Sequence, residues 1–179
     1  MTEENVKSTE SQAAEEPIKK AVTQPVLDQI VTRISESVGS DAIEDAYINA
    51  LSDDIPTVVI KNEHWFATAR ILKQAPELSM NYLRNITGVD QEKHLEAVYH
   101  FTNIETKQEC CIKVKTDREN SRIASITPLW PTADWQEREI FDLLGIEFIG
   151  HPNLKRIMMS DDWSGHPLRK DYEPLDPEV

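Results

Sequence analysis

The sequence is poor in cysteine: two residues of this type occur among 179, and they are adjacent, at Cys110 and Cys111. A disulfide between neighbouring residues would be strained, and no second cysteine pair stands at the spacing of a zinc site. Two thiols also fall short of the four thiolates that an iron–sulfur cluster usually takes. We therefore interpret both cysteines as free thiols and expect no cluster in this chain.

Long apolar runs are missing as well. No stretch approaches the ~18 consecutive apolar residues that a membrane-spanning helix needs, and the first residues lack the apolar centre of a secretory signal. Glycine is scarce, at five residues, and no glycine-rich dinucleotide fingerprint occurs. These absences predict a chain that stays in the cytoplasm and has no dinucleotide-binding turn.

The formal net charge of -13 is unevenly distributed along the chain. Residues 1–60 carry twelve acidic and four basic side chains, whereas residues 151–172 carry four basic and three acidic ones. Sequence-general nucleic-acid binding and adhesion to an anionic membrane both take a concentrated basic face. The charge pattern therefore argues against nucleic acid and membrane as direct partners and favours another protein.

Three stretches differ in composition. Residues 1–24 combine glutamates with Ser, Thr, Gln and Ala and have almost no large apolar groups, so we predict a disordered acidic tail. Residues 25–150 hold the periodic apolar patterns of a folded domain. Residues 151–179 are rich in Pro, Asp, Trp and charged groups and have too few periodic apolar positions for a core of their own. We predict an extended segment there that lies against another surface.

The middle stretch predicts helices and strands in alternation. The elements expected are helices over 26–38, 62–75 and near 78–84, and strands over 43–48, 57–60, 94–103, 110–115 and near 122–126. The strands over 94–103 and 110–115 alternate apolar and polar residues across a short polar link, which indicates an antiparallel hairpin. This mixture predicts an α+β domain, with helices packed on a mainly antiparallel sheet and an irregular extended C-terminal segment.

A further helix is expected between Asp134 and Gly145. Asp134 followed by Glu137 resembles a capping box, and Gly145 stands where a glycine ends a helix. Glu137 falls within the apolar face, so its carboxylate needs a partner, and two remain open: the amide of Asp134, or an arginine of this chain or a neighbour. Arg138 and Asp142 are four residues apart, and we expect them to form a solvated surface pair.

The C-terminal part of the chain carries residue types that are enriched at buried protein interfaces. They are the tryptophans Trp130, Trp135 and Trp163 and the arginines Arg156 and Arg169. Packing within the domain is the role expected for Trp130 and Trp135. Trp163 and the two arginines are then candidates for contact with another protein.

The stretch from Glu137 to Met158 resembles a known family. It fits the signature of the C subunit of NADH-quinone oxidoreductase: Glu-Arg-Glu, two free positions, an acid, two aliphatic residues, six free positions, His or Lys, three free positions, a basic residue or Pro, one free position and two apolar residues. The residues from Asp161 to Tyr172 continue this resemblance, which is dense over about residues 128–172.

The resemblance implies a non-catalytic structural subunit of the peripheral arm of a proton-translocating NADH-quinone oxidoreductase. Such a subunit binds no cofactor and no metal, while FMN, the Fe–S clusters and the quinone are expected on partner subunits. In the family it packs against the D subunit, which helps to form the quinone pocket, and lies near the cluster-bearing B subunit. The chain is then part of an enzyme only within the complex, peripheral to the cytoplasmic side of the cell membrane.

The family resemblance also implies which residues to examine where subunits meet. We expect several of those that match the motif to contact D or B: Glu137, Arg138, Glu139, His151, Lys155, Arg156, Asp161, Asp162, Trp163, His166, Arg169, Lys170 and Tyr172. Related subunits serve membrane-bound hydrogenases and ferredoxin- or deazaflavin-dependent complexes, so the electron donor stays open.

Three other functions compete with this interpretation. A metal-assisted hydrolytic site would gather His151, Asp161, Asp162 and His166, but their spacing matches no ligand motif, and both histidines precede proline, which favours turn-forming and hydrogen-bonding roles. A cysteine nucleophile is disfavoured, because both thiols lie in an expected strand without a helix N-terminus to lower a thiol pKa. The third alternative is a stand-alone assembly adaptor.

Overall fold

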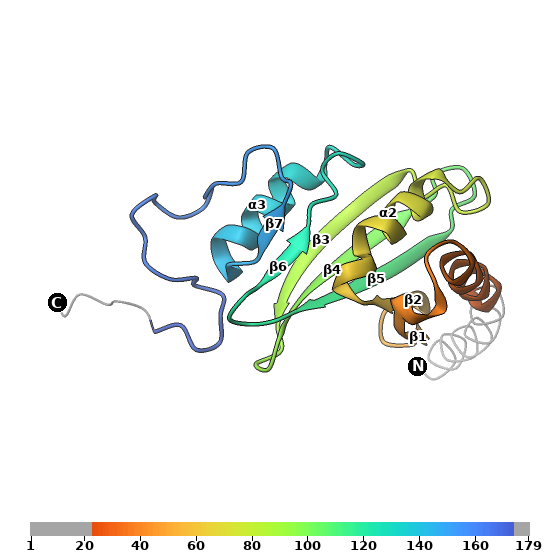
Figure 1. Ribbon diagram of the computed structural model, residues 1–179, viewed down its shortest axis with the longest axis horizontal. Coiled ribbons are helices and arrows are strands. Elements are labelled where there is room, and N and C mark those ends of the chain that lie inside the picture. Colours follow the sequence, from red (N-terminus) through yellow and green to blue (C-terminus); the bar gives the residue numbers. More distant parts are fainter. Residues whose placement is uncertain (1–22, 174–179) are drawn as a thin grey trace, which may run out of the picture.

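The computed structural model describes residues 23–173. A five-stranded sheet, a two-stranded sheet and three α-helices form its folded part, and a long irregular segment follows the last strand (Figure 1). The acidic tail predicted over 1–24 lies almost wholly outside the described residues, as does the end of the predicted C-terminal segment. Within the described range, no helix has the length and apolar character needed to cross a membrane.

The main sheet has the strand order β1-β2-β5-β4-β3. Its strands are β1 (Ile43–Asn49), β2 (Ile55–Ile60), β3 (Tyr82–Asp90), β4 (Leu95–Thr102) and β5 (Glu109–Thr116). The β2–β5 pair is parallel and the other neighbouring pairs are antiparallel. The sheet is therefore mixed but mostly antiparallel, which confirms the predicted α+β class. The predicted hairpin is the β4–β5 pair.

Helices cover one face of this sheet (Figure 1). They are a helix over residues 23–37 and the helices α2 (Trp65–Gln74) and α3 (Ala133–Leu144). The 3-10 turns η1 (Ser40–Ala42) and η2 (Asn62–His64) precede β1 and α2. Ile30, Leu72 and Ile140, one from each α-helix, join a single buried cluster with Val58 and Ile112 of the sheet. Burial of apolar area, worth about 25 cal/mol per Å², drives this packing.

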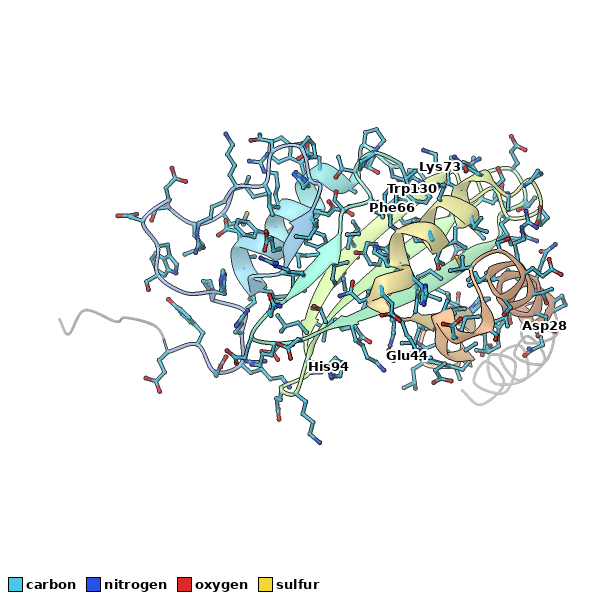
Figure 2. All side chains as sticks on the ribbon, in the orientation of Figure 1. Asp28, Glu44, Phe66, Lys73, His94 and Trp130 are labelled. Carbon is cyan, nitrogen blue, oxygen red and sulfur yellow. The ribbon has the colours of Figure 1, made fainter. Side chains whose placement is uncertain are left out.

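The centre of the core is aromatic. The ring centroids of Trp65 and Tyr99 lie 4.3 Å apart, and those of Phe101 and Trp130 lie 4.7 Å apart. Trp130 belongs to the loop before α3, and Figure 2 shows it beside α2, where the Lys73 ammonium lies 5.3 Å from the ring centroid. Such aromatic pairs add ~0.5–1.5 kcal/mol each beyond their buried area. They hold the loop before α3 against the sheet, and Trp130 packs within the domain as predicted.

The helix predicted near residues 78–84 is wrong, because the chain forms strand β3 from Tyr82 onward. The ladder between β3 and β4 shifts its register between Leu83 and Asn85. This irregularity lets Leu83 and Ile86 both be buried although they are three residues apart. A spacing of three imitates a helical repeat, so the bulge concealed the alternation of the strand.

Two short strands build a second, smaller sheet around α3. The strand predicted near residues 122–126 is β6 (Arg122–Ala124), but it pairs with β7 (Glu147–Ile149) and not with the main sheet. The pairing is parallel, and α3 is the connection between the two strands. Since parallel neighbours need a crossover of this kind, β6, α3 and β7 form one unit. This unit positions the residues of the candidate site.

Gly88 of β3 is a point of close contact between the sheet and α3. A Cβ at this position would overlap Leu144 Cδ1 and stand 2.9 Å from Ile140 Cγ2. We expect Gly88→Ala to lower the free energy of unfolding in urea by about 1 to 3 kcal/mol, the usual cost of overpacking a core. In a double-mutant cycle with Leu144→Ala, the paired loss should be smaller than the sum of the single losses. Additive losses would contradict this contact.

Candidate functional site

The predicted site residues lie on α3 and on residues 151–173, which we call the C-terminal strap. Gly145 ends α3 in the left-handed conformation, at φ 75°, as predicted. The start of the helix differs from the prediction, because α3 begins at Ala133 and its N-cap residue, Thr132, makes no side-chain hydrogen bond. Among the described residues, Asp134 and Glu137 do not form the predicted capping box. The Glu137 carboxylate has other partners.

Glu137 is fully buried and accepts three hydrogen bonds from the chain between β6 and α3. The donors are the Ser125 hydroxyl at 2.5 Å, the Ile126 amide at 2.8 Å and the Thr127 hydroxyl at 3.0 Å. The Asp134 amide and an arginine of this chain, both considered from the sequence, are therefore wrong as partners, and an arginine of a neighbour stays a prediction. Burial raises the pKa of Glu137 to about 7, although the three hydrogen bonds act to lower it.

Asp142, also fully buried, is the main anchor of the C-terminal strap. Its Oδ2 accepts hydrogen bonds from the amides of Ile157, Met158 and Met159 at 2.8, 2.6 and 3.0 Å. Its Oδ1 accepts one from Arg156 Nη1 at 2.7 Å. Burial acts to raise the pKa of Asp142, but these four donors outweigh burial and lower it. A single ionised carboxylate thus fixes the strap to α3.

Arg138 binds the strap and not Asp142, so the solvated pair predicted between these two residues is wrong. Its side chain is 8% exposed, and its Nε donates to the Lys155 carbonyl at 3.3 Å. Its guanidinium carbon lies 4.8 Å from the ring centroid of Trp135. Trp135 is 62% exposed, which contradicts its predicted packing within the domain. An exposed tryptophan held against a buried arginine is a pair typical of interface anchors.

Two histidines of the strap form hydrogen bonds with main-chain groups. His151 Nδ1 accepts a hydrogen bond from the Asn153 amide at 3.0 Å, so its Nε2 carries the proton and donates to the Asp134 carbonyl at 3.2 Å. His166 Nδ1 donates to the Asp142 carbonyl at 3.0 Å. Burial lowers the pKa of His166, which favours its neutral form. Both imidazoles serve as structural hydrogen-bonding groups.

Two arginines that were predicted to contact partners bind main-chain carbonyls of this chain. Arg156 Nη2 donates to the Gly165 carbonyl at 3.2 Å, and Arg169 Nε donates to the Leu144 carbonyl at 2.7 Å. The second bond satisfies a carbonyl at the end of α3 that has no partner within the helix. The ring of Tyr172 covers Gly165, where a Cβ would stand 2.9 Å from Tyr172 Cε2. Arg156, Gly165, Arg169 and Tyr172 thus give the strap its shape.

The end of the strap is fastened by two residues that the sequence analysis did not select. Asp90, at the end of β3, accepts hydrogen bonds from the Arg118 guanidinium and from the Lys170 amide, the latter at 2.9 Å. Arg118 also binds the Asp171 carboxylate at 2.5 Å. Asp171 lies inside the motif stretch and was within reach of sequence reasoning. Asp90 and Arg118 lie far from it in the chain, and no local pattern marks them.

The remaining predicted contact residues point to solvent. The exposed side chains among them are Glu139, Lys155, Asp161, Asp162, Trp163 and Lys170. Trp163 is 39% exposed, and two apolar neighbours on the strap, Met158 and Leu168, are 63% and 59% exposed. The site residues therefore divide into an inward-facing group that holds the strap and an exposed group that α3 and the strap display. Their contact with other subunits stays a prediction.

Metal and thiol chemistry find little support in this geometry. In residues 23–173 no group of three or more His, Cys, Asp and Glu side chains is placed to hold a metal ion. Cys110 and Cys111 are free thiols, as predicted, and both are buried. Burial raises both thiol pKa values, that of Cys111 to about 11. At neutral pH only a very small fraction of either thiol is therefore present as the nucleophilic thiolate.

The Asp90 contact predicts how the end of the strap responds to acid. Burial acts to raise the pKa of Asp90, but hydrogen bonds from Arg118 and two main-chain amides lower it from 3.8 to about 2. Because the folded chain releases this proton at a lower pH than the unfolded chain, the stabilisation is present above pH 3.8 and is lost as the pH falls toward 2. The NMR shift of the Lys170 amide should report this midpoint.

Removing the guanidinium tests this assignment. In Arg118→Met the midpoint should move upward, toward the ordinary carboxyl value, because the favourable charge is gone. Lys115→Met is the matched control, since it removes a cation of β5 whose side chain is 40% exposed. It should leave the midpoint in place. An unshifted midpoint in Arg118→Met would show that Asp90 owes its low pKa to other groups.

Known proteins are similar to this chain in sequence and in fold. The sequence model of the family described as the 30 kDa subunit of respiratory-chain NADH dehydrogenase matches residues 58–178. The C subunit of the NADH-quinone oxidoreductase of Roseiflexus sp. (strain RS-1) is 46% identical over 125 residues, which cover 68% of this chain and 71% of that relative. The matched region holds most of the main sheet, all of α3 and the strap.

Two solved structures are similar in fold. The trypsin-resistant fragment of Nqo5 superposes with a TM-score of 0.58 at 25% identity and covers 70% of this chain and 99% of that one. A chain of the membrane-bound sulfane sulfur reductase, an archaeal respiratory membrane complex, superposes with a TM-score of 0.65 at 23% identity, covering 83% and 86% of the two chains. The second likeness concerns the fold alone.

Proposed function

Because this chain belongs to the family of the 30 kDa subunit of respiratory-chain NADH dehydrogenase, we propose that it serves as the C subunit in the peripheral arm of an NADH-quinone oxidoreductase. The observation that carries the proposal is the family match across residues 58–178, which includes the strap. In this proposal FMN, the Fe–S clusters and the quinone are bound by other subunits. The chain takes part in electron transfer from NADH to quinone by supporting those subunits, on the cytoplasmic side of the membrane.

The disposition of acid–base groups supports a structural role. Glu137, Asp142, His151 and His166 are the groups of the motif best suited to proton transfer, and each one is engaged in hydrogen bonds within the chain. A catalytic group has to reach a substrate, whereas these side chains are turned inward to hold α3 and the strap. The chain then contributes a rigid, preformed surface to the complex and catalyses no chemical step itself.

The exposed group supplies the proposed contacts with the D subunit, with the B subunit nearby. Trp135 and Trp163 are large aromatic side chains held on a fixed framework, which lowers the entropy cost of binding. Because Arg156 and Arg169 bind carbonyls of this chain, substituting them would disturb the strap itself as well as any contact. The tryptophans are therefore cleaner probes of the interface.

Affinity purification of the tagged chain from gently solubilised native membranes tests the proposal. We expect D- and B-type subunits in the mass spectra, together with NADH-binding flavoprotein subunits. Trp135→Ala with Trp163→Ala should lower the recovery of D at least about tenfold, the effect of losing two interface anchors. Leu51→Ala is the control, since Leu51 is 100% exposed on the β1–β2 turn and should change nothing.

The composition of the purified complex also identifies the electron donor. D and B without the flavoprotein subunits would keep the structural role but assign the chain to a related complex with another donor. Recovery of the chain alone would overturn the proposed function and leave the assembly adaptor.

A further inference from the structure

Strand β3 is an edge of the main sheet (Figure 1). Among residues 23–173 its only strand partner is β4, so its other side carries main-chain N–H and C=O groups without a strand to bind. An open edge of this kind is a template for another extended chain. Natural proteins usually cover or interrupt such edges, so a nine-residue edge strand requires explanation.

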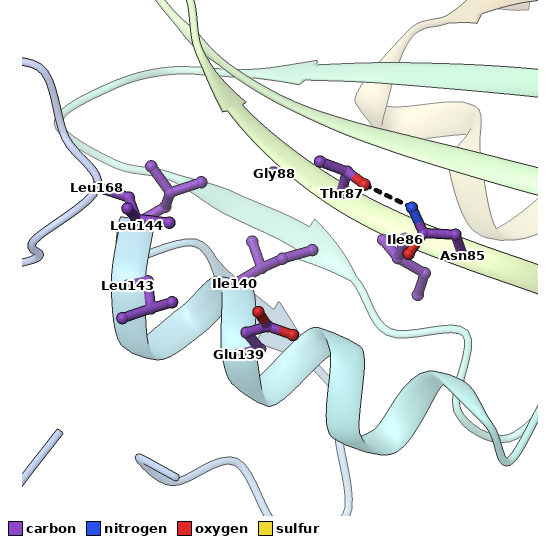
Figure 3. Close-up of a pocket in the computed structure, with 9 residues that line it drawn as sticks. All are labelled: Asn85, Ile86, Thr87, Gly88, Glu139, Ile140, Leu143, Leu144 and Leu168. Carbon is purple, nitrogen blue, oxygen red and sulfur yellow. Dashed lines mark hydrogen bonds between the residues drawn. The ribbon is translucent and has the colours of Figure 1, made fainter. Parts of the chain in front are cut away.

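A groove of about 160 Å³ lies between β3 and α3. Residues 85–88 of β3 line one side, and Ile140 and Leu143 of α3 line the other (Figure 3). Leu168 of the strap also lines the groove, so the groove is continuous with the surface that the strap displays. An extended chain that entered here would find main-chain partners on one side and apolar side chains on the other, the two components of strand addition.

One acidic group, Glu139, lines the groove. It is exposed, and within the described part of the chain it makes no hydrogen bond or ion pair. Its neighbour Arg138 is directed away, to the strap. A basic side chain of an incoming segment would therefore complement an otherwise unpaired carboxylate.

We propose that β3 and this groove receive an extended segment of another subunit, which joins the main sheet as an additional strand and sets a basic side chain beside Glu139. The inference rests on the proposed function, because it takes the segment from a subunit of the same complex. Apolar side chains of the segment lie against Leu143 and Leu168. Main-chain hydrogen bonds supply affinity, and the groove residues Glu139, Leu143 and Leu168 supply selectivity.

A second copy of this chain is a poorer occupant. Pairing β3 with β3 of a second copy would continue the same face of the sheet and set the second α3 beside the first. Adjacent strands are ~4.8 Å apart, whereas packed helices need ~8–10 Å. Since α3 packs directly on β3 at Gly88, a second helix has no room there. The two Glu139 carboxylates would also approach each other.

The ends of this chain also fit poorly. Residues 174–179 have two acidic side chains, no basic one and two prolines, which lack the N–H needed for pairing. Residues 1–22 have five acidic and three basic side chains, so their net charge repels Glu139. They precede the helix over residues 23–37 (Figure 1). This helix lies beside β1 and β2, toward the edge of the sheet opposite to β3.

Hydrogen–deuterium exchange of the full chain, alone and in the purified complex, tests the proposal. The amides of residues 83–89 that point away from β4 should exchange at least about tenfold more slowly in the complex than in the isolated chain. Glu139→Lys should abolish that protection. Glu105→Lys is the matched control, since Glu105 is an exposed acid between β4 and β5, and it should leave the protection unchanged.

A photo-crosslinking amino acid at Leu143 identifies the occupant. The expected product joins this position to an extended, lysine- or arginine-bearing peptide of another subunit. Partners that co-purify while the β3 amides stay unprotected would overturn the inference and leave the proposed function intact. Protection that grows with the concentration of the isolated chain would indicate a second copy, and a cross-link within the chain would indicate its own tail. Either result overturns the proposal. Recovery of the chain alone would overturn both this inference and the proposed function.

Discussion

Replacing Asp142 with alanine should release the middle of the C-terminal strap from α3. The change leaves the amides of Ile157, Met158 and Met159 without their shared acceptor and the Arg156 guanidinium without its carboxylate. Removing one member of a buried charged pair usually costs ~3–5 kcal/mol. We therefore expect these three amides to exchange with solvent at least ~100-fold faster than in the wild-type chain, as measured by hydrogen–deuterium exchange.

The core of the domain should survive this change. Of the strap, Leu154 alone packs against the buried cluster of the described residues, and it is only partly buried. Asp142→Asn should have an intermediate effect, because an amide keeps one acceptor oxygen but turns an N–H toward the other donors. Glu139→Ala is the matched control, an exposed carboxylate of the same helix. Wild-type exchange rates in Asp142→Ala would mean that other contacts suffice to hold the strap.

Replacing Glu137 with glutamine should remove the part of the pH dependence of domain stability that the titration of Glu137 causes. The folded chain holds the Glu137 proton up to about pH 7, whereas the unfolded chain releases it near 4.5. The folded state thus binds more protons between these values, so the stabilisation is complete below pH 4.5 and is lost as the pH rises toward 7. The loss between pH 5 and pH 8 amounts to about 2 to 3 kcal/mol.

Urea unfolding of the two chains at pH 5 and pH 8 measures this effect. Glutamine keeps the size and an acceptor for the Ile126 amide, and the hydroxyls of Ser125 and Thr127 accept as well as donate, so the variant should fold. Its loss of stability from pH 5 to pH 8 should be smaller than that of the wild-type chain by that amount. Glu139→Gln, the exposed control, should follow the wild-type chain. Identical pH profiles for Glu137→Gln and wild type would rule out a raised pKa.

Both variants test how the proposed subunit presents its surface to the complex. Asp142 and Glu137 point from one helix into two neighbouring segments, the strap and the loop after β6. Each acts as a hub that satisfies several donors at once, so losing either should disturb the geometry of the displayed surface more than the core. Defects in these variants should therefore appear as failed assembly.

The sequence determined by itself those features whose causes are local. Apolar alternation placed the β4–β5 hairpin, and a glycine able to adopt positive φ placed the end of α3 at Gly145. The wheel position of Glu137 established that its carboxylate would be buried. The long polar motif from Glu137 to Tyr172 identified the family, because its spacing is itself a property of the sequence.

Only the tertiary structure decided which groups meet. Glu137 binds the chain before α3, Asp142 binds the strap 14 to 17 residues further on, and Arg118 joins Asp90 to Asp171 across separations of 28 and 53 residues. A buried carboxylate must find donors, but periodicity and propensity say nothing about which distant donors the chain will bring to it. The edge of β3 that no other described strand pairs with is also decided in this way, since the strand order is a property of the assembled sheet.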